Sequence, residues 1–186
     1  MALIPNNGWG AGDDGSWVLT PGSSGGECSI ITSDPRNGIY HLNLLKNIAG
    51  SQSSARADFN DAPAIVGMTV VFTVRCKAIG SPTTGCQLQL GYIGSAQGNT
   101  IVSQSSGDNG GVYKDLVLTS VAIPSDATAL RFIVATESSN SGRWYVDDMA
   151  VVVKDAGGNV GFASDLDAQP GAIAGKAVYA VEVDWD

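Results

Sequence analysis

The strongest constraint on the fold of this chain is a repeated alternation of apolar and polar residues. In residues 68–77 (MTVVFTVRCK) apolar side chains occupy every second position, the pattern of a strand with one buried face. Similar runs occur at 16–20, 27–33, 38–45, 55–60, 86–92, 111–121, 129–136 and 143–154. No window of about 11 residues has apolar residues at helical spacing. The sequence therefore predicts an all-β protein with almost no helix.

The segments between these runs are rich in residues that favour turns. The chain has 24 glycines, and its loops at 21–26, 103–110 and 137–142 consist largely of Gly, Ser, Asn, Asp and Pro. Many short strands at this spacing indicate a sandwich or a barrel. We expect the runs at 68–77 and 86–92 to form an antiparallel hairpin through residues 79–85.

Cysteine chemistry gives no signal for a disulfide framework or a zinc site. There are three cysteines, Cys28, Cys76 and Cys86, an odd number without C-x-x-C spacing. Cys76 and Cys86 fall on the inward phase of the two runs above. We therefore expect buried free thiols.

The charge of the chain excludes some partners. The net charge is −8 and the ten basic residues are scattered, whereas binding to nucleic acid or to an anionic membrane needs clustered Lys and Arg. No apolar run approaches the ~20 residues of a membrane span. Residues 1–14 lack the basic and apolar regions of a secretory signal, so we expect synthesis in the cytoplasm if Met1 is the natural start. If it is not, a secreted protein remains an alternative.

The chain changes character after residue 153. We divide it into a sandwich domain, residues 1–153, and a C-terminal arm, residues 154–186. Residues 155–176 are rich in Gly, Ala and Asp and resemble an extended loop, and residues 177–186 (AVYAVEVDWD) alternate clearly. An apolar strand face must be buried, so this terminal strand either packs on its own domain or adds to a neighbouring chain.

The arrangement of polar residues argues against an enzyme. The single histidine, His41, has no G-x-S-x-G serine motif to accompany it. Asp147 and Asp148 are adjacent on a predicted strand, so their side chains point to opposite faces unless a bulge intervenes. We therefore expect a non-catalytic protein.

Several motifs together resemble the galactose-binding-like jelly roll of carbohydrate-binding modules. They span residues 6–153 in family order and are Asn7-Gly8-Trp9, Asp13-Asp14-Gly15-Ser16-Trp17, Gly38-Ile39-Tyr40-His41-Leu42, the glycine-led strand at 67–74, the proline-led run at 123–132, and Trp144-Tyr145-Val146-Asp147-Asp148. The resemblance implies a jelly-roll β-sandwich of about 8–10 antiparallel strands, and it does not specify a ligand.

The resemblance also implies a structural Ca²⁺ ion. Related modules hold calcium between the N-terminal loop and the last strand, which places candidate ligands at Asn7, Asp13, Asp147 and Asp148. Carboxylates and loop carbonyls are the oxygen ligands that Ca²⁺ needs. The sequence departs from the family because no glutamate follows the first aromatic residue. The alternative is that these aspartates cap turns or stay solvated.

Glycan binding would need exposed aromatic residues beside polar groups. Phe72, Phe132, Tyr92 and Tyr40 have the phase of core residues. The remaining candidates for a glycan platform are Trp9, Tyr113, Trp144 and Tyr145.

Two function classes follow from these observations. The first is a virion accessory protein, such as a phage capsid decoration or a head or tail appendage, with homo-oligomer contacts through the arm, a major capsid or tail protein as partner, and surface glycans as further ligands. The second is a carbohydrate-binding module of a secreted glycan-active enzyme, which would be extracellular.

Overall fold

The computed structural model describes residues 17–33, 35, 40–47, 50–60, 62–83, 85–96, 102–106, 110–137 and 141–165. These residues form eleven strands and one short 3₁₀ helix, η1. Their bounds are β1 Val18–Thr20, β2 Glu27–Ile31, β3 His41–Lys46, β4 Ser54–Phe59, η1 Ala62–Ile65, β5 Thr69–Ile79, β6 Cys86–Ile93, β7 Val102–Ser106, β8 Lys114–Thr119, β9 Ala129–Thr136, β10 Gly142–Lys154 and β11 Val160–Asp165. Within this part of the chain no helix has the length and apolar character needed to cross a membrane.

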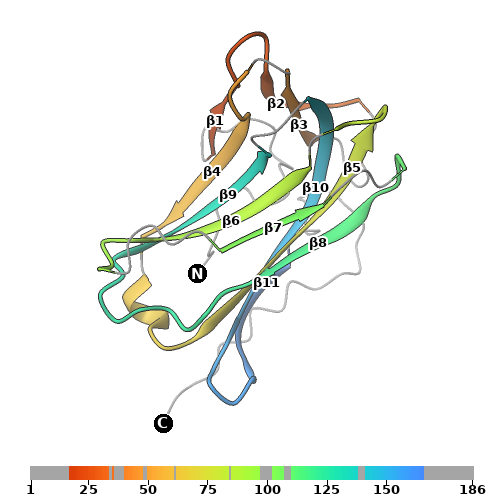
Figure 1. The fold of residues 1–186 in the computed structure, drawn as a ribbon. Helices are drawn as coiled ribbons and strands as arrows, with labels where there is room; N and C mark the ends of the chain where they lie inside the picture. Colours follow the sequence, from red (N-terminus) through yellow and green to blue (C-terminus); the bar gives the residue numbers. More distant parts are fainter. Residues whose placement is uncertain are drawn as a thin grey trace.

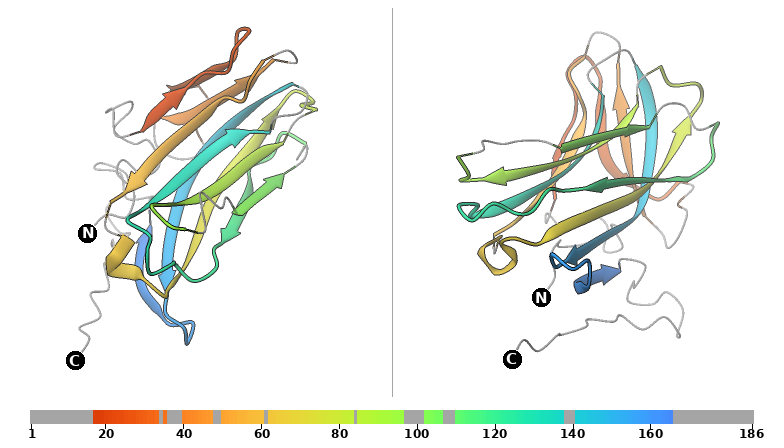
Figure 2. Two further views of the ribbon diagram at one scale, coloured as in Figure 1. Left: turned by 60° about the vertical axis from the view of Figure 1, so that its left-hand side comes forward. Right: turned by 60° about the horizontal axis from the view of Figure 1, so that its bottom comes forward.

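The strands form two antiparallel sheets that pack face to face (Figures 1 and 2). One sheet has the order β1-β4-β9-β6-β7 and is called the β9 sheet below. The other has the order β2-β3-β10-β5-β8, with β11 paired to β10, and is called the β10 sheet. The predicted all-β jelly-roll sandwich is confirmed.

The core fills the space between the sheets, and β5 shows most regularly how every second side chain enters it. In β5 the side chains of Val70, Phe72, Val74 and Cys76 have no exposed surface, while their neighbours are half-buried. Phe72 of the β10 sheet meets Phe132 of the β9 sheet edge to face, with ring centroids 5.2 Å apart, a favoured aromatic geometry. The period of two read from the sequence is therefore the period of the core.

The predicted hairpin of 68–77 with 86–92 is wrong. β5 pairs with β10 and β8, whereas β6 pairs with β9 and β7. β5 and β6 therefore lie in different sheets and bury their apolar faces in the same core from opposite sides. The inward phase of Cys76 and Cys86 is nevertheless confirmed, since neither thiol is exposed.

Two strands lie in segments that were expected to be loops. β7 covers residues 102–106, most of which belong to the expected loop 103–110. β11 lies within the expected extended part of the arm and pairs with residues 150–154 of β10. Figure 1 shows β10 and β11 as a blue hairpin at the bottom of the molecule. The arm therefore begins with a strand of the sandwich, and the terminal strand at 177–186 lies outside the described residues.

The three predicted buried thiols all lie inside the sandwich. The pKa of Cys86 is raised well above its ordinary value, first by a hydrogen bond with Cys76 and then by burial. A thiol with a raised pKa stays protonated and unreactive at neutral pH. These cysteines are core residues.

Candidate functional site

Two of the predicted glycan residues lie on the outer face of the β10 sheet. Tyr145 is directly opposite Lys77 across β10 and β5, and the Lys77 ammonium lies 5.5 Å from the centre of the Tyr113 ring. On its other side, Tyr145 packs against His41, with ring centroids 4.3 Å apart. Each tyrosine ring therefore already has a protein partner, which reduces its use as a sugar platform.

The prediction for Trp144 is wrong, because its side chain has no exposed surface and belongs to the core. Its neighbours in β10 explain the error. Tyr145 faces outward, so Trp144 must face inward. Trp9 lies outside the described residues.

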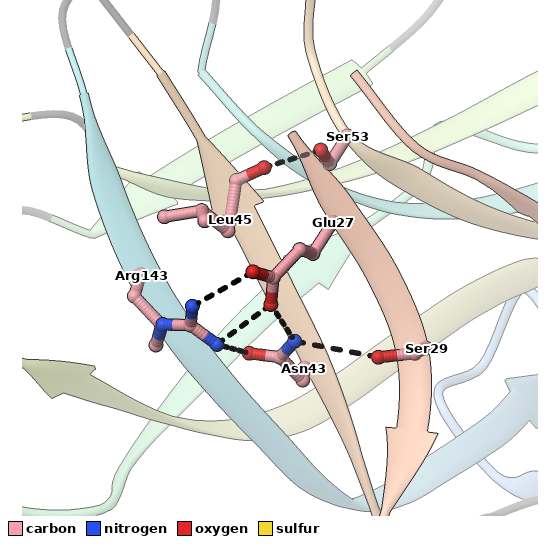
Figure 3. A network of polar contacts seen from close by, with 6 residues as sticks. All are labelled: Glu27, Ser29, Asn43, Leu45, Ser53 and Arg143. Carbon is pink, nitrogen blue, oxygen red and sulfur yellow. Dashed lines mark hydrogen bonds and ion pairs between the residues drawn. The ribbon is translucent and has the colours of Figure 1, made fainter. Parts of the chain in front are cut away.

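A polar cluster also lies on this face and joins three strands (Figure 3). Arg143 of β10 donates to both carboxylate oxygens of Glu27 in β2, at 2.9 and 3.1 Å, and to Asn43 Oδ1 in β3 at 2.7 Å. Asn43 Nδ2 in turn donates to Glu27 at 2.9 Å. The hydrogen bonds from Arg143, followed by the one from Asn43, lower the pKa of Glu27. All of these strong contacts are internal, so the cluster holds β2, β3 and β10 together.

Asp147 and Asp148 lie at a β-bulge, the exception that the sequence argument allowed. The register shifts between Asp147 and Ala150, and Asp148 has φ 44°, the left-handed conformation of a bulge residue. Asp148 accepts a hydrogen bond from Arg75 at 3.1 Å, and the backbone N–H of Asp148 donates to Asp147 Oδ1 at 2.9 Å. The bulge thus turns Asp148 toward Arg75, on the outer face.

These contacts bear on the predicted calcium ligands. The carboxylate of Asp148 is paired with Arg75, which competes with a cation for the same oxygens. Asp147 is almost fully buried and fits a ligand role better. Asn7 and Asp13 lie outside the described residues, and within those residues no group of three His, Cys, Asp or Glu side chains could hold a metal ion. The calcium site stays a prediction.

A second polar surface, which the sequence analysis missed, is the outer face of the β9 sheet. It is called the amide face below and consists of Gln52, Arg56, Asp58, Gln87, Gln89, Arg131 and Ile133. These side chains alternate with core residues such as Leu88 and Phe132, so they point away from the core. All are half-buried or exposed. No aromatic residue occupies the outward positions of β4, β6 and β9.

The amide groups of this face are held in place by one another. Gln87 Oε1 accepts a hydrogen bond from Gln89 at 2.8 Å and a longer one from Gln52 at 3.4 Å. Gln52 also donates to the backbone oxygen of Thr136 at 2.7 Å. The Gln87 NH₂ group and the Gln89 carbonyl oxygen take no part in these hydrogen bonds within the described residues. A donor and an acceptor side by side match neighbouring hydroxyl groups of a ligand.

An ion pair lies at the other side of the amide face. Arg131 of β9 donates from Nε and Nη2 to the two carboxylate oxygens of Asp58 in β4, at 2.7 and 2.8 Å. This forked geometry is the strong form of the interaction. Hydrogen bonding by Arg131 lowers the pKa of Asp58, and Arg56 adds a smaller electrostatic effect. The face is therefore polar, charged and already ordered before a ligand arrives.

The residues of the amide face can form hydrogen bonds and ion pairs with a ligand. Catalysis by a serine or cysteine needs a base within hydrogen-bond reach of the nucleophile. His41 is fully buried against Tyr145, away from the amide face on the other sheet. The amide face offers hydrogen-bond donors, acceptors and one apolar side chain, Ile133.

Comparisons with known proteins support the fold. No protein-family model and no curated protein matches this sequence. Among solved structures, the enzymatically active domain of bacteriophage CBA120 tailspike protein 4 aligns with a TM-score of 0.63 and 13% identity, over 81% of this chain and 21% of that chain. A family 16 carbohydrate-binding module aligns with a TM-score of 0.58 and 20% identity, over 81% of this chain and 99% of that one. The C-terminal family 22 module of Clostridium thermocellum Xyn10B gives 0.54 and 19%, over 84% and 97%.

The chain has the sandwich fold of carbohydrate-binding modules. It spans nearly the full length of such modules but about one fifth of the tailspike chain. At these identities the likeness concerns the fold, and the ligand must be argued from the side chains.

Proposed function

We propose that this protein is a non-catalytic virion accessory protein, a phage capsid decoration or a head or tail appendage, that contacts glycans through its amide face. The observation that carries the binding role is the ordered array of Gln52, Gln87 and Gln89 on the outer face of the β9 sheet. The virion role is supported by the likeness to one module of a phage tailspike chain. The alternating apolar residues at 177–186, which predict a terminal strand, support assembly with other subunits.

The virion role is tested by the mass of the protein in solution. We compare the full chain with a chain that ends at Asp165 by light scattering. This end point keeps β11, which pairs with β10, so the shortened chain retains every described strand. We expect an oligomer for the full chain and a folded monomer for the shortened one. A monomer in both cases contradicts assembly through the terminal segment.

A second candidate is a carbohydrate-binding module of a secreted, glycan-active enzyme. It is favoured because the chain matches the whole length of isolated modules. The two candidates share the amide face and differ in assembly. A monomeric chain that binds a glycan would favour this second candidate.

The glycan contact is tested with a double variant, Gln87→Ala/Gln89→Ala. Removing both amides eliminates the outward donor and acceptor, so binding on a glycan array should fall below detection. Tyr145→Ala, on the opposite face, is the matched control and should bind as the original chain does. If the tyrosine variant loses binding and the glutamine variant keeps it, the site lies on the β10 sheet instead.

We also propose a structural calcium ion. Among the described residues, Asp147 is its candidate ligand. A bound ion stabilises the folded state in proportion to the logarithm of its concentration. Thermal unfolding with millimolar CaCl₂ should therefore occur at a higher temperature than with a chelator, and Asp147→Asn should remove the difference. Equal unfolding temperatures in both buffers would exclude the ion.

A further inference from the structure

Among the arginines of the described residues, Arg56 is the one without an ion pair to a described carboxylate, although it acts electrostatically on nearby Asp58. In this part of the chain Arg75 pairs with Asp115 and Asp148, Arg131 with Asp58, and Arg143 with Glu27. Arg56 is exposed and forms no such ion pair there.

Arg56 lies on the amide face in line with its central residues. It is directly opposite Ile133 on β9, which is directly opposite Gln89 on β6. Arg131 is the diagonal neighbour of Arg56 across β4 and β9, since Asp58 is the residue opposite Arg131. Diagonal positions are about 7–8 Å apart, within reach of long side chains.

Among the seven residues that define the amide face there are two guanidinium groups, Arg56 and Arg131, and one carboxylate, Asp58. Arg131 uses Nε and Nη2 for Asp58, and its Nη1 group remains for another acceptor. A surface charge acts over about one Debye length, ~8 Å at physiological salt, so a ligand on this face is within range of both guanidinium groups.

We propose that the amide face binds a glycan that carries a carboxylate, with Arg56 holding the carboxylate. This inference rests on the proposed glycan contact. Guanidinium groups bind carboxylates through two parallel hydrogen bonds. The amides of Gln87 and Gln89 form hydrogen bonds with hydroxyl groups of the same glycan. Ile133 packs against the C–H surface of a sugar ring. Arg56, with help from Arg131, which also binds Asp58, matches a ligand group of a single negative charge.

The test compares each acidic glycan with its own neutral form. Oligosaccharides containing galacturonate, glucuronate, mannuronate or sialate are titrated calorimetrically into the full chain, each beside its carboxyl-reduced counterpart. We expect one or more acidic forms to bind at least about 10-fold more tightly than the reduced form, because hydrogen bonds to charged groups are the stronger ones. This preference should diminish as salt is added.

Two variants test whether Arg56 causes the preference for acidic glycans. Arg56→Gln keeps a polar side chain and should abolish the 10-fold preference, while Lys114→Gln, which removes an equal charge from an exposed position on β8 of the other sheet, should leave it unchanged. Circular dichroism checks that both variants are folded.

Three outcomes overturn the inference. The first is equal binding of acidic and reduced glycans, which leaves the glycan contact intact if Gln87→Ala/Gln89→Ala still abolishes it. The second is a preference that survives Arg56→Gln. The third is a panel in which no acidic glycan binds, which leaves the assembly test of the virion role unaffected.

Discussion

At the scale of single residues, Ser53 shows how a buried hydroxyl connects the two sheets. The Ser53 hydroxyl donates to the backbone oxygen of Leu45 at the end of β3 and accepts from the N–H of Gly22 at 2.8 Å. Its own N–H donates to Thr136 Oγ1 at 3.1 Å, at the end of β9. Ser53 is fully buried, so these groups depend on one another for their hydrogen bonds.

Ser53→Ala should lower the free energy of unfolding by about 1–3 kcal/mol, because it leaves the N–H of Gly22 and the oxygen of Leu45 without this partner. Urea unfolding measures the change. Ser81→Ala, at an exposed position, is the matched control and should change the free energy by less than about 0.5 kcal/mol. A loss of equal size in both variants would contradict the bridging role.

Two carboxylates make the stability depend on pH. The pKa values of Glu27 and Asp58 are both lowered in the folded state, by Arg143 and Arg131 respectively. A lowered folded pKa gives stability that is fully present above the unfolded pKa of about 4 and is lost as the pH falls below it. The groups are partly exposed, so each pair should contribute at most about 1 kcal/mol.

The free energy of unfolding should therefore fall between pH 6 and pH 3, and Glu27→Gln and Asp58→Asn should each reduce the steepness of that fall. Urea titrations at several pH values measure it. Asp115→Asn is the control, since its pair with Arg75 is more exposed. An unchanged slope in both test variants would show that other groups govern the acid response.

At the scale of elements, the bulge in β10 decides where the strand points its side chains. Two residues, Asp148 and Met149, occupy the space opposite Val74 of β5. The extra residue lets Met149 enter the core while Asp148 reaches Arg75. Without it, the second half of β10 would present the wrong face to the core, because a one-residue slip exchanges the faces of a strand.

Asp148→Val should destabilise the protein by about 1–2 kcal/mol more than Asp148→Asn. Both variants lose the negative charge, but only valine is strained at a φ of 44°. Asparagine tolerates this conformation. Thermal and urea unfolding of the two variants measure the difference, and equal stability would contradict a strained position.

At the scale of the whole molecule, the sandwich is completed by a strand from the region that the sequence assigned to the arm. Two strands pair with successive parts of one edge of β10. β3 pairs with residues 142–146 and β11 with residues 150–154. Removing β11 would leave the second half of β10 with an unpaired edge. Such edges invite association with other chains.

A chain that ends at Lys154 should therefore unfold at a temperature lower by roughly 5 °C or more than a chain that ends at Asp165. It should also aggregate more readily. Thermal unfolding followed by circular dichroism, with light scattering on the same samples, measures both effects. If the two chains behave alike, β11 adds nothing to the stability of the sandwich.

The alternation of residues determined the elements and which side chains each of them buries. The predicted run 129–136 coincides with β9, and the runs at 68–77 and 143–154 differ from β5 and β10 by one or two residues at an end. This succeeded because burial of one strand face is a local, period-two property. It failed at β7, where the segment VSQSS has a single apolar residue. It also failed at Trp144, whose position beside the outward Tyr145 in β10 places it in the core.

Only the tertiary structure decided which strands are neighbours. The short connection of residues 80–85 fits a hairpin and a crossing between sheets equally well, and the common core selects the crossing. The amide face arises in the same way, because Asp58 and Arg131 are 73 residues apart and meet only when β4 lies beside β9. Sequence period fixes the face of each strand, but pairing depends on contacts between distant segments, which local alternation does not encode.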